Sequence, residues 1–213
     1  MNILDNYYNI KNTINSLSKN TNLIVVTKNF NMDKIDPIIK AGHLNFGENK
    51  VQEATYKWSD ILKNNKDINL HLLGNLQSNK VSEAVNIFNY IHSLGSEKLA
   101  NKLMQEENIK KKKLKYFIQI NLGDEAQKSG ISVDDSADFI NFCKNQLKLN
   151  ILGLMCIPPV DKDPNLYFSN LKKLASASNL SHLSMGMTHD YVDAIRHGST
   201  YIRIGTGIFG QRL

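Results

Sequence analysis

The chain has 213 residues, a length that favours one domain spanning residues 1–213 with a sizeable core and leaves little room for a second. Its 26 Lys and Arg residues outweigh its 20 Asp and Glu residues, and the net charge of +6 would help attract anions, but no nucleic-acid-binding module accompanies it. The two cysteines, Cys143 and Cys156, are too few for a disulfide framework or a cysteine-rich zinc site, so we expect a cytoplasmic protein.

The first predicted element is an amphipathic helix near the N-terminus. Ile3, Tyr7, Ile10 and Ile14 recur at helical spacing and form one apolar stripe. Because these residues are spaced rather than continuous and Asp5 lies among them, the segment is neither a signal peptide nor a membrane span.

Strand-like and helix-like segments then alternate to the end of the chain. The predicted strands cover residues 23–27, 43–46, 70–74, 89–92, 115–121, 150–155, 181–185 and 200–204. The predicted helices between them cover residues 33–41, 49–63, 78–86, 96–109, 134–148, 166–177 and 189–197.

This alternation predicts the fold class, which is α/β. Parallel strands joined by crossovers form either an open doubly wound sheet or a closed eight-stranded barrel. Eight units in 213 residues favour a single (β/α)8 TIM barrel, whose usual size of about 250 residues can fall to about 200. The N-terminal helix is additional and would cap or flank the barrel.

Such barrels bind their ligands at the C-terminal ends of the strands. We therefore expect one rim to collect the polar and glycine residues that follow each predicted strand. These residues include Lys28, Asn49, His92, Ser93, Asn121, Cys156, Ser184, Gly186, Gly205 and Thr206.

Lys28 ends the first predicted strand, after four aliphatic residues. A lysine amine forms a Schiff base readily only when desolvation or a cationic neighbour lowers its pKa, and an apolar base supplies the first condition. A solvated lysine that happens to end a strand is the simpler interpretation of this feature taken alone.

The loops after the seventh and eighth strands are the usual phosphate site of these barrels. Ser184 and Thr206 can donate hydroxyl protons, and Gly186 and Gly205 allow backbone N–H groups to approach a phosphate. Ordinary turn chemistry explains each glycine separately but not the matched pair of loops, so we predict phosphate binding here.

Arg203 shares a face of the eighth strand with Tyr201, and Ile202 takes the other. A buried arginine needs a partner, either a ligand or a structural ion pair. If it faces a pyridine nitrogen, it can only donate, so that nitrogen stays unprotonated and the ring is a weak electron sink. A phosphate site, an arginine and a strand-end lysine together suggest pyridoxal 5'-phosphate (PLP).

Other chemistries find less support. The six histidines show no paired ligand spacing, so we expect no metal. The GTGIFG segment at 205–210 matches a dinucleotide fingerprint, but no full helix, further strand or acidic residue follows it. Glu48 and Glu53 are interpreted as residues that start and line a helix, and we assign no catalytic residue.

Several segments resemble the pyridoxal-phosphate homeostasis protein family, which is related to the N-terminal domain of alanine racemase. The matching segments are VVTK at 25–28, FGENKVQEA at 46–54, HLLGNLQSNK at 71–80, INLGDEAQKSGI at 120–131, GLMCIPP at 153–159, LSMGMTHD at 183–190 and GSTYIRIGTGIFGQR at 198–212. They are colinear and span nearly the whole chain.

The resemblance implies a PLP-binding barrel that holds the cofactor as an internal aldimine on Lys28. Ser184, Gly205 and Thr206 match phosphate-contacting motifs of the family, and Arg203 matches the arginine near the pyridine nitrogen. Asn49 matches an asparagine near the cofactor pocket. The family's role in vitamin B6 homeostasis implies PLP-dependent or B6 salvage enzymes as partners.

Four positions depart from the family pattern. Thr27 and Thr188 replace Ser, Asn75 replaces Pro, and Lys50 replaces the Tyr that usually follows the GEN motif. The change at Lys50 is the least conservative and could alter the charge of the rim.

We interpret the chain as a non-catalytic PLP-binding protein, with two alternatives. A PLP-dependent racemase of the related fold would need a second acid–base group from an additional domain, for which eight barrel units leave no room. An aldolase would use Lys28 without PLP and would be colourless. We expect no nucleic-acid or membrane partner, and a monomer, because no long exposed apolar stripe is present.

Overall fold

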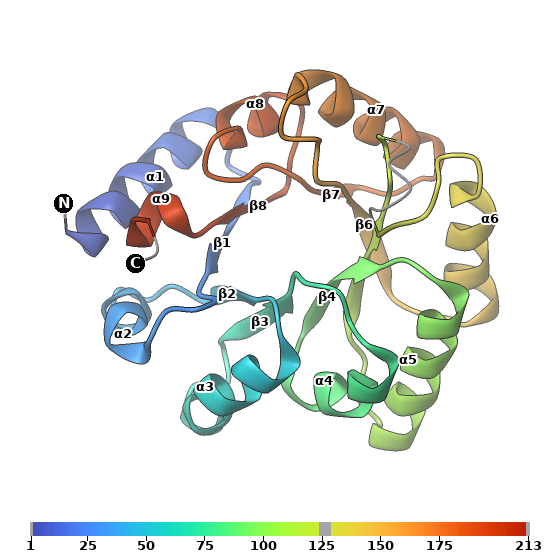
Figure 1. The fold of residues 1–213 in the computed structure, drawn as a ribbon, viewed down its shortest axis with the longest axis horizontal. Helices are drawn as coiled ribbons and strands as arrows, with labels where there is room; N and C mark the ends of the chain where they lie inside the picture. The colour runs from blue at the N-terminus through green and yellow to red at the C-terminus, as the bar shows by residue number, and fades with distance from the viewer. Residues whose placement is uncertain (1, 124–128, 212–213) are drawn as a thin grey trace.

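The structure, a computed structural model, describes residues 2–123 and 129–211, and forms a closed barrel of eight parallel strands in the order β1 to β8 (Figure 1). The strands are β1 (Asn22–Val26), β2 (Asn45–Glu48), β3 (Asn69–Leu72), β4 (Tyr90–Leu94), β5 (Lys115–Gln119), β6 (Ile151–Met155), β7 (His182–Ser184) and β8 (Tyr201–Ile204). All eight predicted strands and the predicted TIM barrel are confirmed. Residues 124–128 of the 120–131 motif and Arg212 of the last motif lie outside the described residues.

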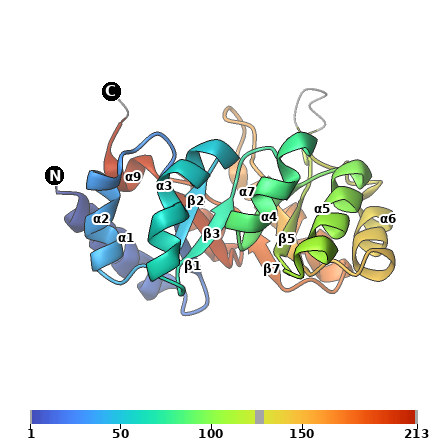
Figure 2. The same cartoon turned by 90° about the horizontal axis from the view of Figure 1, so that it is seen from below.

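The helices surround the barrel (Figures 1 and 2). They are α1 (Ile3–Leu17), α2 (Met32–Lys40), α3 (Val51–Asn64), α4 (Val81–Ile87), α5 (Glu97–Lys110), α6 (Ser136–Asn141), α7 (Pro164–Ala177), α8 (Tyr191–Arg196) and α9 (Thr206–Phe209). A 3-10 turn over Ser78–Lys80 precedes α4, and a π-helical turn over Phe142–Gln146 continues α6. The sequence did not predict α9, which has only four residues.

The barrel closes through pairing of β1 with β8, in which Leu23 lies opposite Ile202 and Ile24 opposite Arg203. Since successive side chains of a strand point to opposite faces, Ile202 packs in the layer between strands and helices, whereas Tyr201 packs inside the barrel. The predicted division of β8 into two faces is confirmed. Arg203, on the face of Tyr201, therefore belongs to the barrel interior.

Two hydrophobic clusters follow from this division. The larger one fills the space between strands and helices, and the smaller one fills the barrel interior with Ile24, Tyr90, Phe117, Met155 and Tyr201. Branched aliphatic residues usually dominate such an interior, so its aromatic composition is a distinctive feature of this chain. Within the described part of the chain, no helix has the length and apolar character that a membrane crossing requires.

Candidate functional site

A cavity of about 250 Å³ opens at the C-terminal end of the barrel. It lies between the ends of β1, β2 and β8 and the loops that follow β3, β6 and β7. Five of the seven predicted site residues line it, namely Lys28, Asn49, Arg203, Gly205 and Thr206. The barrel thus brings together residues from both ends of the sequence.

Lys28 reaches the cavity because of the alternation along β1. Ile24 lies in the barrel interior, and Val26, two residues later, lines the cavity. Lys28 continues the same face beyond the end of the strand and also lines the cavity. The apolar base predicted for this lysine is therefore present.

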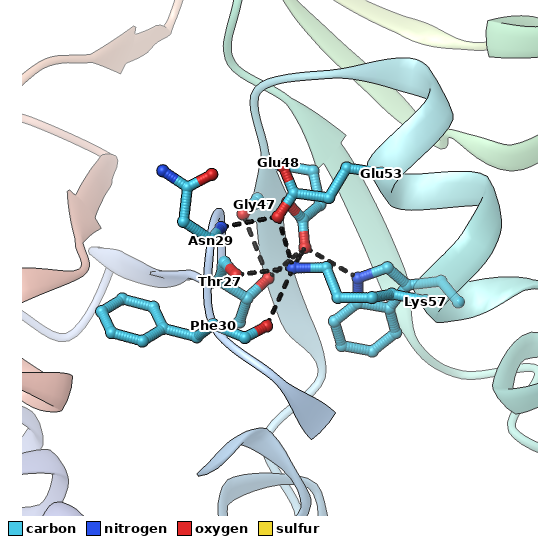
Figure 3. Close-up of polar contacts among 8 residues, drawn as sticks. Thr27, Asn29, Phe30, Gly47, Glu48, Glu53 and Lys57 are labelled. Atoms are coloured by element: carbon cyan, nitrogen blue, oxygen red, sulfur yellow. Dashed lines mark hydrogen bonds and ion pairs between the residues drawn. The ribbon is translucent and has the colours of Figure 1, made fainter. Parts of the chain in front are cut away.

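The backbone on both sides of Lys28 is fixed from α3 (Figure 3). The Lys57 ammonium donates to the carbonyl of Thr27 at 2.7 Å, and the N–H of Asn29 donates to Glu53 Oε1 at 2.5 Å. Lys57 and Glu53 lie one helical turn apart and form an ion pair at 2.9 Å. Asn29 has a φ of 62°, a left-handed conformation that asparagine tolerates better than most residues. These contacts fix the path of the chain that presents Lys28.

Glu48 completes this cluster. Its Oε1 accepts hydrogen bonds from Thr27 Oγ1 at 2.7 Å and Trp58 Nε1 at 3.0 Å, and lies 2.7 Å from the Lys57 ammonium. Burial raises the pKa of the Glu48 carboxyl above its usual value, although these three donors oppose the shift. The sequence interpretation that Glu53 lines a helix is confirmed, but Glu48 ends β2 instead. The available sequence signal for this cluster was the four-residue spacing of Glu53 and Lys57, which is typical of an ion pair on a helix. The contacts of Lys57 with Glu48 and Thr27 join segments far apart in the sequence and left no such signal.

Two hydroxyl groups of the cavity lining meet. Thr188 Oγ1 lies 3.0 Å from Thr206 Oγ1 and accepts a hydrogen bond from the N–H of Gly207 at 3.2 Å. A Cβ at Gly207 would approach the Thr188 methyl group to 3.1 Å, and one at Gly205 would approach the carbonyl of Val26 to 3.1 Å. The glycines thus let two chain segments close around the hydroxyls. We call Thr188, Gly205, Thr206 and Gly207 the hydroxyl seat.

Thr188 was not selected from the sequence, although it lies in the predicted phosphate loop. Its hydroxyl was the available signal, but a loop sequence does not reveal which of its side chains faces the ligand.

Arg203 forms the base of the cavity, with 5% of its surface exposed. Its Nη1 donates to Ser184 Oγ at 2.8 Å, and its Nη2 donates to the carbonyl of Cys156 at 3.0 Å. Burial lowers the pKa of the guanidinium below its ordinary value, while Cys156 and Asp190 oppose this shift. Neutral oxygens thus fix the guanidinium, which leaves its charge available to a ligand.

Ser184 and Gly186 do not line the cavity. Ser184 is fully buried below Arg203, and Gly186, with a φ of 93°, packs so closely that a Cβ would lie 2.5 Å from that of Ala194. Direct contact of either residue with a phosphate stays a prediction. His92 was expected at the rim, but it lies within β4 and is buried in the barrel. This expectation was wrong because β4 extends two residues further than predicted.

Two larger cavities adjoin the first along the rim. One, of about 480 Å³, shares Asn49 and is also lined by Lys50 and Lys80, and the other, of about 420 Å³, shares Ile157. The unusual Lys50 therefore lies beside the candidate site rather than in it. Among residues 2–123 and 129–211, no group of three or more His, Cys, Asp and Glu side chains is placed to hold a metal ion.

In a comparison with protein families, the chain matches the alanine racemase N-terminal domain over residues 2–213. Among curated proteins, the pyridoxal phosphate homeostasis protein of Synechocystis sp. is 38% identical over 209 residues, covering 94% of this chain and 95% of the relative. That of Pasteurella multocida is 36% identical over 200 residues, covering 89% and 86%.

Solved structures agree with these relatives. PipY of Synechococcus elongatus, solved with PLP bound, is 32% identical, with a TM-score of 0.88 and coverage of 98% of this chain and all of PipY. An alanine racemase of Clostridium difficile has a TM-score of 0.76 at 14% identity, and the match covers 99% of this chain but 57% of the racemase. The racemase likeness concerns the fold alone.

Proposed function

We propose, from the premise that the chain belongs to the family of pyridoxal phosphate homeostasis proteins, that it binds PLP in the cavity lined by Lys28 and does not catalyse a reaction. This family lies within the wider alanine racemase N-terminal domain family. One observation carries the proposal: Lys28, Arg203 and the two threonine hydroxyls of the hydroxyl seat all line one cavity. The PLP bound to PipY supports the same ligand. We propose that PLP-dependent or vitamin B6 salvage enzymes exchange the cofactor with it.

The residues of the cavity fit the three functional groups of PLP. Its aldehyde requires an amine, its phosphate requires donors, and its ring nitrogen accepts one hydrogen bond when unprotonated. Lys28 supplies the amine, and Thr188 and Thr206 supply hydroxyl donors. Gly207 lies so close to Thr188 that any larger residue there would crowd its side chain. Arg203 supplies only donors. We therefore assign the phosphate to the hydroxyl seat and the ring nitrogen to Arg203.

When bound, PLP supplies an aldehyde that condenses with a primary amine to a C=N bond and releases one water. Lys28 provides this amine from the end of β1, where Val26 and Leu73 give the cavity an apolar wall. Arg203 can donate a hydrogen bond to the ring nitrogen but does not transfer a proton to it, because a guanidinium is not deprotonated in proteins. It would hold the ring nitrogen unprotonated, which weakens the electron withdrawal on which most PLP enzymes depend.

A racemase remains the second candidate because of His189. The ionisable side chains of the cavity lining are Lys28, His189 and Arg203, and a second acid–base group is what racemisation requires beside the lysine. His189 is exposed on the loop after β7, so it lacks the enclosed environment in which a general base is usually tuned. We therefore favour binding over turnover.

The test is covalent attachment of PLP. Purified protein with added PLP should show a visible absorbance band, and borohydride should fix a pyridoxyl group to the peptide that contains Lys28. Lys28→Ala should lose both signals, whereas Lys34→Ala, which removes a lysine on α2, should retain them. L-alanine incubated in D2O with the loaded protein should keep its α-proton.

Attachment that is absent, or that survives in Lys28→Ala, would overturn the binding proposal. Rapid α-proton exchange that His189→Ala abolishes would instead support the racemase.

A further inference from the structure

A row of polar side chains crosses the barrel interior below the cavity. Ser184 on β7, His92 on β4 and His71 on β3 are each fully buried, although this layer is apolar in most such barrels. Burying polar groups is unfavourable unless each one finds a partner. The row therefore needs a physical reason beyond filling space.

The side chains form one continuous hydrogen-bond chain that begins at Arg203. Its Nη1 lies 2.8 Å from Ser184 Oγ, which lies 2.8 Å from His92 Nδ1. His92 Nε2 lies 2.9 Å from His71 Nδ1, and His71 Nε2 lies 3.2 Å from Asn45 Oδ1. We call Ser184, His92, His71 and Asn45 the relay.

The two ends of the relay fix the direction of its bonds when both histidines are neutral, because the Arg203 guanidinium only donates and Asn45 Oδ1 only accepts. A guanidinium only donates, so Ser184 Oγ accepts from Arg203 and can give its single proton to His92 Nδ1. A neutral His92 then carries its proton on Nε2 and donates to His71 Nδ1. His71 in turn donates from Nε2 to Asn45 Oδ1. Each atom has one consistent role.

Both histidines are suited to this neutral arrangement. Burial lowers the pKa of His71 to about 3, and burial, His71 and Arg203 together lower the pKa of His92 well below its usual value. The His92 ring stacks on Phe117 with centroids 4.4 Å apart, and the His71 ring stacks on Tyr90 at 4.1 Å. The rings are thus held in one tautomer and one orientation.

We propose that Ser184, His92 and His71 are positioning residues whose relay holds the Arg203 guanidinium in one orientation at the base of the cavity. Each bond of a directional chain polarises the next, so His92 makes Ser184 Oγ a better acceptor for Arg203 without contacting the cavity itself. The consequence for PLP rests on the proposed function, whereas the effect on Arg203 does not.

The first experiment uses protein without cofactor. NMR of ¹⁵N-labelled arginine side chains should show hindered rotation of the Arg203 guanidinium. Ser184→Ala and His92→Phe should both accelerate this rotation, and His92→Phe conserves a ring that can stack on Phe117. His92→Asn returns an acceptor near the Nδ1 position and should restore slow rotation.

The second experiment uses PLP labelled with ¹⁵N in the ring. In the loaded wild type the ring nitrogen should have the shift of an unprotonated, hydrogen-bonded pyridine. Ser184→Ala should move it toward the protonated value and weaken PLP binding roughly tenfold, the effect of losing about one charged hydrogen bond. His92→Phe should change both in the same direction by less.

Ser199→Ala is the matched control, because Ser199 is also a buried serine of this region but donates to the carbonyls of Met185 and Tyr201 outside the relay. It should leave both NMR signals unchanged. If the Arg203 guanidinium rotates at the wild-type rate in both Ser184→Ala and His92→Phe, the proposed role of the relay is overturned. If His92→Phe does not fold, the rotation rate in Ser184→Ala alone tests the proposal. Failure of PLP to attach to the wild type would overturn the proposed function, while the Arg203 rotation would still decide the relay.

Discussion

Lys57 shows at the residue scale how a buried charge organises the chain around Lys28. Its side chain is 7% exposed and contacts Glu48, Glu53 and the carbonyls of Thr27 and Phe30. Two carboxylates and two carbonyl oxygens satisfy an ammonium that would otherwise be costly to bury. The same contacts set the geometry of the loop after β1.

Lys57→Met should destabilise the fold and weaken PLP attachment. Removing one partner of a buried ion pair leaves the others unsatisfied, at a cost of about 3 kcal/mol or more in the free energy of unfolding. Urea denaturation measures this loss, and the rate of attachment at Lys28 should fall in the protein that remains folded.

Lys63→Met is the control on the same helix, because Lys63 and Asp60 pair at the surface with side chains 71% and 92% exposed. Exposed pairs contribute little, so this variant should behave like the wild type. Equal effects of both substitutions would contradict the assigned role of Lys57.

At the element scale, α1 closes the ring of helices. Each strand of such a barrel is normally followed by a helix, and in the described part of the chain the helix after β8, α9, has four residues. In Figure 1, α1 lies beside α9 and α8, and the Asn6 amide donates to the carbonyl of Ile208 in α9 at 3.0 Å. The predicted extra helix therefore flanks the barrel and covers the seam between β8 and β1.

Ile14→Ala should test this role of α1. Ile14 is 2% exposed, and truncating such a side chain costs about 2–5 kcal/mol through lost burial and a cavity. Leu17→Ala, on the same helix but at a position 40% exposed, should cost much less. Thermal denaturation of both variants gives the comparison. Equal losses would mean that α1 is not a packed part of the barrel.

At the scale of the whole molecule, three buried imidazoles couple stability to pH. Burial lowers the pKa of His43 to about 4 and that of His71 to about 3, and it lowers the pKa of His92 well below its usual value. In the unfolded chain each titrates near 6.5. Below that pH the unfolded state binds protons that the folded state does not, so acid favours unfolding.

The free energy of unfolding should therefore fall as the pH falls from about 7.5 to about 5. At about pH 5, which is about 1.5 units below the pKa of a histidine in the unfolded chain, each of the three histidines lowers the free energy of unfolding by about 2 kcal/mol. The raised pKa of Glu48 opposes the trend, but one carboxyl does not offset three imidazoles. Urea denaturation at both pH values measures the difference.

His43→Phe should remove about one third of the decrease in the free energy of unfolding between about pH 7.5 and about pH 5. His189→Gln, at an exposed position, should leave this decrease unchanged. Stability that stays constant or rises toward about pH 5 would contradict the assignment of neutral buried histidines.

The sequence by itself determined the architecture. Apolar periodicity and turn residues located all eight strands, and strict alternation with helices required parallel pairing. The strand ends then predicted which residues gather at one rim, and Lys28, Arg203 and Thr206 do line a common cavity. These inferences succeed because they depend on local periodicity and on the direction of the chain.

Only the tertiary structure decided how deep each side chain lies and which partner it meets. Ser184 was expected at the rim but lies below Arg203, Thr188 instead contributes to the hydroxyl seat, and Lys57 reaches Thr27 from another helix. One residue along a strand changes the face of a side chain, and two change its depth by about 6.6 Å. Barrel register and loop packing set these positions, and both arise from contacts between segments far apart in the sequence.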